Sequence, residues 1–356
     1  MSDAADPSTT GPPGRGLNVL SLFDGHACLM AALESIGVAV DTYGAVESDP
    51  AAIAIAVANW GTRVTHVRHD FDANTRCRGG NRRRLPQAKF DTERSGDVTL
   101  VTRKDLTRVF GRKRIDLVAG GPPCQDFSGA NGRRGSAGGT ATYSGLELMR
   151  ATCRAIKLVE KHNAAIQKGA PHIVVENVSS MRTTDRMQVT TLLRLDLVHV
   201  EAGLLGASRR PRLYWTTLPV EEVDEATARA APSLRDKLPA GWSTPYAKAL
   251  TVRASQTTIG LGEVEKLLFR PPCRGKNNNR RGYTPLCRND AAKDNPAAWT
   301  SPSVPLLEDL MGLTPGYVTG PVAEGIVSEA QARHALGNGF SIQAMAHVLA
   351  HLSPSA

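Results

Sequence analysis

No apolar run in this 356-residue sequence approaches the roughly 20 residues that cross a bilayer, so no transmembrane helix is expected. The six cysteines form no CxxC pair and no cluster with histidine, which disfavours a disulfide framework and a structural zinc site. We therefore expect no metal and a reducing, cytoplasmic compartment. Residues 1–16 are polar and have no signal-peptide core, so they are predicted to form a disordered tail.

Positive charge is concentrated in two segments of a chain whose formal charge is +9. Residues 74–114 hold 13 Lys and Arg against 4 Asp and Glu, and residues 269–293 hold 7 against 1. Such segments suit a polyanionic partner, because neutralised phosphates dominate nucleic-acid affinity. Two solvated basic loops would have the same composition, so charge alone leaves both interpretations open.

Predicted strands and helices alternate along the first two thirds of the chain. Apolar, β-prone runs predict strands at 17–23, 38–46, 115–119, 172–175, 198–202 and 212–217. Helical spacing predicts helices at 29–36, 50–60 and 146–161. This order predicts an α/β fold with a doubly wound, Rossmann-like sheet.

The predicted sheet domain covers residues 17–219 and contains a basic insertion at 72–97. Periodicity weakens over 220–301, where Pro, Gly, Asn and Arg accumulate, which predicts a small, loop-rich region inserted late in the sheet domain. Residues 302–356 are expected to return to the sheet domain and to end in a closing helix.

A candidate ligand site follows the first predicted strand at Phe23-Asp24-Gly25-His26. Open α/β sheets bind ligands at the carboxyl ends of their strands, where a glycine lets the backbone turn closely around the ligand. Glu47 lies about 20 residues further on, where an acid can hold a ribose diol. No G-x-G-x-x-G is present, so a cofactor with a ribose but no pyrophosphate fits better than a dinucleotide.

A second candidate site is the segment Gly-Gly-Pro-Pro that precedes Cys124. The two prolines keep the backbone extended, so the thiol is expected to project from the end of a strand. The glycine-rich stretch 129–145, which contains Arg133 and Arg134, has the composition of a loop that closes over a substrate. An inert, buried cysteine beside a turn is the alternative, which the double proline and the basic loop disfavour.

Charged residues mark two further strand ends. Glu176 follows an apolar strand, where desolvation would let its carboxyl group stay protonated and donate a proton; a capping carboxylate is the alternative. Arg210 and Arg212 alternate along a predicted strand, so their side chains should point to the same side. Two guanidiniums on one face suit a phosphate or a carbonyl oxygen, although a solvated strand face has the same pattern.

With these motifs in this order from Leu17 to Leu352, the sequence resembles the cytosine-5 DNA methyltransferase family. The resemblance lies in SLFDG at 21–25, the acid Glu47, KDL at 104–106, GGPPCQDFS at 120–128, ENV at 176–178, the Arg210/Arg212 pair and GNGFS at 337–341. It implies catalytic roles for Cys124, Glu176, Arg210 and Arg212. It implies cofactor-binding roles for Phe23, Asp24, Gly25, His26, Glu47, Asp105, Leu106, Asn338, Phe340 and Ser341.

The activity that the resemblance implies is transfer of a methyl group from S-adenosylmethionine to C5 of a cytosine flipped out of DNA. The thiolate of Cys124 would add to C6, Glu176 would protonate N3, and the arginines would stabilise charge near O2. Residues 220–301 would form the target-recognition region. The cations expected to contact DNA are Arg133, Arg134, Arg274, Lys276, Arg280 and Arg281.

Within this family the sequence is similar to the de novo (DNMT3-like) branch. RLYWTTLP at 212–219, ALTVRASQT at 249–257 and TPLCRND at 284–290 carry that similarity. Arginine outnumbers lysine 32 to 11, which favours a GC-rich bacterial or phage genome. His26 and Cys28 depart from the residues expected after the first motif, which would alter the cofactor pocket.

Two other functions remain open. A tRNA cytosine-5 methyltransferase of the same fold would also have basic segments and these motifs. A catalytically silent, DNA-binding accessory relative would keep the fold; it predicts loss of Cys124 or Glu176, and both residues are present.

Overall fold

The computed structural model describes residues 15–67, 96–124, 127, 144–244, 246–252, 286–287 and 299–352. No helix in these ranges is both long enough and apolar enough to cross a membrane. The predicted tail, all but the last two residues of the 72–97 insertion and most of 253–298 lie outside the described residues.

The centre of the fold is a seven-stranded sheet. Its strands are β1 Leu17–Leu22, β2 Val40–Val46, β3 Val64–His66, β4 Leu117–Gly120, β5 His172–Val178, β6 Asp196–Glu201 and β7 Pro211–Thr216. Their order is β3-β2-β1-β4-β5-β7-β6, and only β7 runs antiparallel to its two neighbours. The predicted α/β, doubly wound sheet is therefore confirmed. The strand order reverses between β1 and β4, which is where such sheets bind ligands.

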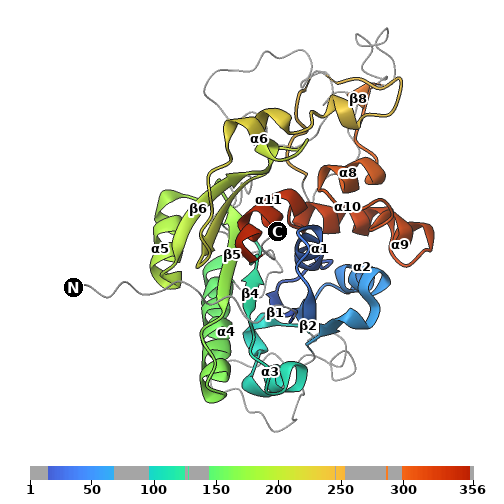
Figure 1. The fold of residues 1–356 in the computed structure, drawn as a ribbon. Helices are drawn as coiled ribbons and strands as arrows, with labels where there is room; N and C mark the ends of the chain where they lie inside the picture. The colour runs from blue at the N-terminus through green and yellow to red at the C-terminus, as the bar shows by residue number, and fades with distance from the viewer. Residues whose placement is uncertain are drawn as a thin grey trace.

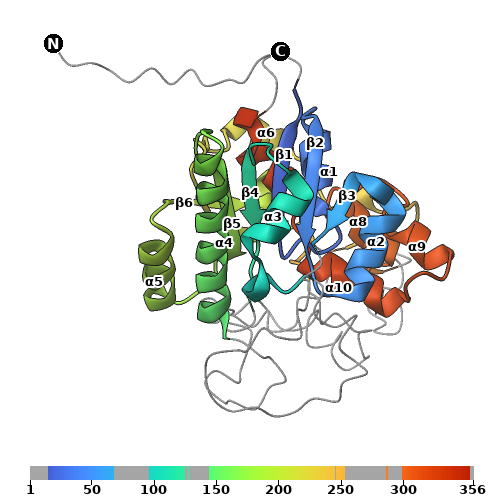
Figure 2. The same cartoon turned by 90° about the horizontal axis from the view of Figure 1, so that it is seen from below.

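Helices cover both faces of this sheet (Figures 1 and 2). One face carries α1 Cys28–Ser35, α2 Pro50–Trp60, α10 Glu329–Asn338 and α11 Ile342–Val348, and the other carries α3 Arg103–Phe110, α4 Gly145–Ala165 and α5 Thr183–Leu193. Alternate residues of β1 feed the two cores: Val19 packs with the first set of helices, and Leu20 and Leu22 pack with the second. Burial on both sides explains why the central strands are continuous apolar runs.

Smaller elements complete the described part of the chain. These are α6 Glu225–Ala230, the antiparallel pair β8 Leu286–Cys287 and β9 Trp299–Thr300, α8 Val304–Leu310 and α9 Thr319–Ala323. The short helices α8 and α9 lie beyond α2, on the same side of the sheet as α10 (Figure 1). The C-terminal segment therefore packs on the face of the sheet that α1 covers.

Among the elements that the sequence missed, β3, α3 and α5 were hard to predict for physical reasons. β3 has only three residues and α5 is rich in Thr, so neither gives a strong periodic pattern. α3 is short, but its start has a clear local cause: Thr102 and Asp105 form a capping box around its first turn. A second capping box, between Ser144 and Glu147, starts α4.

Candidate active site

The loop Phe23–Ala27 joins β1 to α1 at the carboxyl edge of the sheet. Phe23, Gly25 and Ala27 have φ angles of 53°, 60° and 62°, in the left-handed region. Such a conformation costs a non-glycine residue about 1 kcal/mol, so contacts from elsewhere must hold the loop in this shape. Nothing lies within 4 Å of the position that a Cβ on Gly25 would occupy, so the turn leaves open space beside its backbone.

Glu47, at the end of β2, is one of the residues that hold this loop. Its Oε2 accepts a hydrogen bond from the Gly25 amide at 2.7 Å, while Oε1 accepts from the amides of Ser48 and Asp49, both at 2.7 Å. Burial raises the pKa of Glu47, and the three amides act in the opposite direction. A carboxylate has about four acceptor positions, so one is left for a ligand hydroxyl.

Asp24 is buried beneath the loop, with 3% of its surface exposed. Its Oδ1 accepts a hydrogen bond from the hydroxyl of Tyr43 at 2.5 Å, and Oδ2 has no partner among the described residues. Burial raises the pKa of Asp24 from 3.8 to about 7. This side chain is therefore an internal acid that supports the loop and leaves one acceptor unused.

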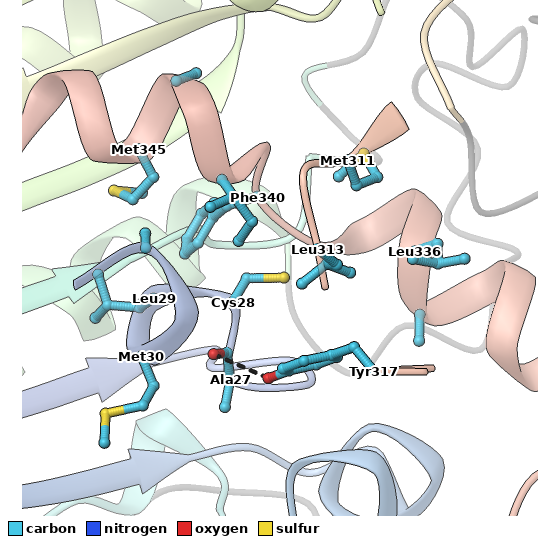
Figure 3. Packing of buried hydrophobic residues seen from close by; sticks show 14 of the residues in the cluster. Ala27, Cys28, Leu29, Met30, Met311, Leu313, Tyr317, Leu336, Phe340 and Met345 are labelled. Carbon is cyan, nitrogen blue, oxygen red and sulfur yellow. Dashed lines mark hydrogen bonds between the residues drawn. The ribbon is translucent and has the colours of Figure 1, made fainter. Parts of the chain in front are cut away.

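His26 is also buried, and the C-terminal segment holds its backbone. The hydroxyl of Tyr317 donates to the carbonyl oxygen of His26 at 2.7 Å and itself accepts a hydrogen bond from Nε1 of Trp60 at 2.7 Å. Figure 3 shows Tyr317 reaching toward Ala27, next to Cys28. An aromatic residue in an irregular segment gives no sequence signal for such a role, so the sequence analysis missed Tyr317 and Trp60.

The imidazole of His26 is neutral at physiological pH. Burial, followed by the positive charge of Arg210, lowers its pKa from 6.5 to about 4. Its Nε2 lies 3.1 Å from Sγ of Cys28, whose pKa burial raises to about 12. The unusual His26 and Cys28 therefore form a neutral, buried pair beneath the loop, and Cys28 is not a reactive thiol.

Asp24 and His26 predict opposite effects of pH on stability. The pKa of Asp24 is higher in the folded than in the unfolded protein, so its contribution to stability falls as pH rises from about 4 to about 7. The pKa of His26 is lower when folded, so its contribution falls as pH drops from about 6.5 to about 4. We expect the difference in unfolding free energy, wild type minus Asp24→Asn, to fall by roughly 4 kcal/mol between pH 4 and 7.

Urea unfolding at several pH values measures this difference. His26→Asn is the matched control, because its difference from wild type should change with pH in the opposite direction. A difference for Asp24→Asn that does not vary with pH would show that the carboxyl group does not titrate as its burial implies.

Asp105, predicted to bind cofactor, has another role in the structure. Its Oδ2 accepts hydrogen bonds from the Thr102 amide at 2.9 Å and from the Thr102 hydroxyl at 2.7 Å, in the capping box of α3. Its neighbour Leu106 is fully buried in the core. Gly96 instead lies against Glu47: a Cβ on Gly96 would overlap the Glu47 carbonyl oxygen. Asp97 directly follows Gly96 in the sequence and is therefore the next acidic residue after the point where the chain meets Glu47. The sequence analysis missed Asp97 because it lies in a polar, basic segment.

Cys124 lies at the end of an irregular segment that follows β4. Asn177, the residue after Glu176, donates a hydrogen bond from Nδ2 to the carbonyl oxygen of Pro122 at 3.1 Å and fixes this segment to β5. A Cβ on Gly121 would lie 2.8 Å from Cε1 of Phe340 and 3.0 Å from Oε2 of Glu176. A larger residue there would displace the Phe340 ring or the Glu176 carboxylate, so the glycine lets the cysteine segment, Glu176 and Phe340 meet.

The Cys124 thiol is half-buried and has cationic neighbours. Burial raises the pKa of the thiol, and Arg212 acts in the opposite direction by stabilising the thiolate. Glu176 also lies close enough to influence the thiol electrostatically. Cys124 is therefore accessible and next to positive charge, which distinguishes it from the fully buried Cys28 and Cys287.

Glu176 and Arg212 form an ion pair beside the cysteine. Nε of Arg212 lies 2.5 Å from Oε1 of Glu176, and the two side chains are 11% and 12% exposed. The geometry follows from the antiparallel register: Glu176 faces Tyr214, so Arg212 is its diagonal neighbour on the same face of β5 and β7. Glu176 lies within β5, two residues before its end, where the sequence analysis had placed it after the strand.

Arg210 uses its guanidinium differently from Arg212. Nη1 donates to the carbonyl oxygen of Val252 at 2.9 Å, and Nη2 donates to those of Gly337 and Gly339 at 3.0 and 2.6 Å. The side chain is fully enclosed, and burial lowers its pKa to about 10. The two arginines, which the sequence predicted to act together, therefore make different contacts. Arg212 pairs with Glu176, while Arg210 binds residues 252, 337 and 339 to the start of β7.

The last predicted motif lies between α10 and α11. Asn338 is exposed, Phe340 is buried next to Gly121, and Ser341 is the N-cap of α11. A Cβ on Gly339 would lie 2.5 Å from Cε1 of His26 and 2.9 Å from Sγ of Cys28. This turn therefore packs against His26 and Cys28 and, through Phe340, against Gly121 in the segment that leads to Cys124. Figure 3 shows Phe340 beside Cys28.

The predicted DNA-contacting cations lie outside the described residues. They are Arg133, Arg134, Arg274, Lys276, Arg280 and Arg281. Among the residues that the structure does describe, no group of three or more His, Cys, Asp or Glu side chains is placed to hold a metal ion. The described part of the candidate site is therefore built from a thiol, an ion pair and the Phe23–Ala27 loop.

Solved structures share this Rossmann-like fold over nearly the whole chain. The Dnmt2 methyltransferase of S. pombe is 14% identical with a TM-score of 0.56, covering 95% of this chain and 98% of that one. The methyltransferase EhMeth of Entamoeba histolytica is 12% identical with a TM-score of 0.55, at the same coverage. A DNA modification methyltransferase encoded within a prophage of E. coli is 18% identical with a TM-score of 0.54, again at that coverage.

A family model matches the segment of the chain that contains Cys124. Residues 83–195 match the family model of the C-5 cytosine-specific DNA methylases. Both Cys124 and Glu176 lie within the matched segment. The match covers about a third of the chain, so the similarity to that family is shown for this segment.

Proposed function

We propose that this protein is an S-adenosylmethionine-dependent DNA (cytosine-5) methyltransferase. The observation that carries the proposal is that one edge of the sheet brings together the Cys124 thiol, the Glu176–Arg212 pair and the Glu47-bound loop. A thiol next to a carboxyl group and a guanidinium matches what addition to a pyrimidine ring needs.

The residues present fit S-adenosylmethionine. The open space beside Gly25, the remaining acceptor of Glu47 and the unpartnered Oδ2 of Asp24 offer a turn and polar groups suited to a nucleoside without phosphates. Bound there, the cofactor would supply an electrophilic methyl group. Glu47 would hold its ribose, and we propose that Asp97 takes the acidic role assigned above to Asp105, because Gly96 lies against Glu47.

The protein's own residues act on the cytosine. With the base flipped into the site, the thiolate of Cys124 adds to C6, which breaks the C5–C6 double bond and makes C5 nucleophilic. Glu176 binds and protonates N3, and Arg212 binds O2, so the negative charge that forms on the ring is neutralised. After substitution at C5, the C5 proton passes to water, the C6–S bond breaks to return the thiolate of Cys124, and Glu176 takes back the N3 proton, which restores the aromatic ring.

Arg210 supports this chemistry without touching the base. Its three hydrogen bonds to carbonyl oxygens hold the 337–339 turn, which packs against His26 and, through Phe340, against Gly121. We assign it a positioning role between the cofactor loop and the cysteine segment. The similarity to the de novo branch, the DNA contacts of residues 129–145 and 269–293, and the target-recognition role of 220–301 remain proposals that rest on the sequence.

Methyl transfer to duplex DNA and to tRNA tests the proposed substrate. Purified protein is incubated with tritiated S-adenosylmethionine and either genomic DNA or total tRNA, and the product nucleosides are separated. We expect 5-methylcytosine in the DNA only. Transfer to tRNA without transfer to DNA would contradict the proposal, and transfer to neither would favour the silent accessory relative.

A further inference from the structure

A groove on the side of the molecule lies between α4 and α5, the two helices at the left of Figure 1. Its volume is about 1190 Å³. Apolar side chains form much of its lining, among them Leu146, Ile156, Met187, Leu192 and Leu195. Met187 is 64% exposed, the largest exposed fraction among the exposed large hydrophobic residues of the described chain. A groove of this kind between two helices can accept a third helix.

The rim of this groove is cationic. Arg150 and Lys157 on α4 and Arg194 at the end of α5 are exposed residues of the lining, and the ion pairs among the described residues include none of them. Glu160 is the acidic residue among the described residues that line the groove. Apolar lining with unpaired cations at the rim is complementary to an apolar segment flanked by carboxylates.

We propose that this groove docks an acidic amphipathic helix of a partner protein. Arg150 and Lys157 are seven residues apart on α4, which is two helical turns or about 10 Å. A helix lying along α4 presents carboxylates at the same seven-residue spacing, while its apolar positions between them fill the groove. The proposal does not depend on the methyltransferase activity, because the groove is lined by α4, α5 and the strand ends beside them and contains none of the active-site residues.

A second copy of this chain is a poorer occupant. A two-fold contact through this face would place Arg150, Lys157 and Arg194 of one copy opposite the same cations of the other. Two Glu160 residues would not neutralise six cations, and like charges in an interface disfavour association. Charge therefore selects a partner of opposite sign.

Two synthetic helices provide the probe. Both are 18-residue fluorescent peptides with leucine at every third and fourth position; one has glutamate and the other lysine at the flanking positions. We expect the glutamate peptide to bind the full-length protein in fluorescence anisotropy at low salt and the lysine peptide not to bind. Equal binding of the two peptides, or binding of neither, would overturn the proposal.

Charge reversal in the groove locates the binding. Arg150→Glu combined with Lys157→Glu should weaken binding of the glutamate peptide by at least roughly tenfold, and Met187→Asp should also weaken it. Lys161→Glu, on the same helix but outside the lining, is the matched control and should change binding less than about twofold. Unchanged melting temperatures show that the variants are folded. Equal losses in the control, or a dimer of the chain that dissociates in Met187→Asp, would contradict the assignment.

Discussion

Replacing Cys124 with serine is expected to lower methyl transfer by at least about 10³-fold. The sulfur must carry negative charge when it adds to C6, and Arg212 stabilises that charge. A serine hydroxyl is a far weaker acid than a thiol, so much less of it is present as the anion. The measurement is the rate of tritium transfer from S-adenosylmethionine to DNA at saturating substrate.

The controls for this substitution are the stability of the protein and its affinity for DNA, which do not depend on the chemical step. Cys124→Ser changes one atom in a half-buried position, so the melting temperature and the affinity for DNA should stay close to wild type. Cys153→Ser, a change of the same kind in a half-buried cysteine of α4, should leave the rate unchanged. Methylation by Cys124→Ser at near the wild-type rate would remove the nucleophile from the proposed mechanism.

The second large effect is expected for Glu176→Gln. An amide keeps the size of the carboxyl group and can still accept a hydrogen bond from Arg212, but it cannot protonate N3. We expect kcat to fall by about 10²-fold, the usual contribution of general acid catalysis. The KM for S-adenosylmethionine should change little, because Glu47 rather than Glu176 contacts the cofactor loop.

A comparison of kcat with KM separates this role from a structural one. Loss of the ion pair with Arg212 would lower stability, so the melting temperature is measured in parallel. Glu47→Gln is the contrasting variant: it should raise the KM for the cofactor more than it lowers kcat. A Glu176→Gln protein with normal kcat and a raised cofactor KM would contradict the proposed role.

The sheet was predictable because its central strands are buried on both faces. β1, β2 and β4 are largely apolar, β-prone runs followed within two residues by glycine or an acidic residue, so both their existence and the position of the ligand edge can be predicted from the sequence. The antiparallel insertion of β7 between β5 and β6 depends on tertiary pairing, and no local pattern in Pro211–Thr216 indicates it. Predicted boundaries also shifted by one or two residues, as with Glu176 inside β5.

The candidate site was predictable where a side chain lies directly after a strand or within a few residues of its end. Cys124 and Glu47 were placed at the carboxyl edge on that basis, and the structure brings both to it. The contacts of Arg210 could not be predicted, because the alternation of side chains along a strand does not show that carbonyl oxygens of residues 252, 337 and 339 surround its guanidinium. The capping contacts of Asp105 could not be predicted either, because a capping box and a ligand-binding acid have similar local sequences. Long-range contacts fix the role of Arg210, and a local capping box occupies Asp105.

Trapping with 5-fluorocytosine tests the nucleophile most directly. Duplex DNA with fluorine at C5 of every cytosine is incubated with the protein and S-adenosylmethionine. A base can remove the proton at C5 but not a fluorine in its place, so the sulfur–carbon bond persists. We predict a protein–DNA adduct that survives denaturation, is absent in Cys124→Ser and maps to Cys124 by peptide sequencing. Methylation of ordinary DNA with no adduct on the fluorinated DNA, or an adduct through another cysteine, would contradict the account.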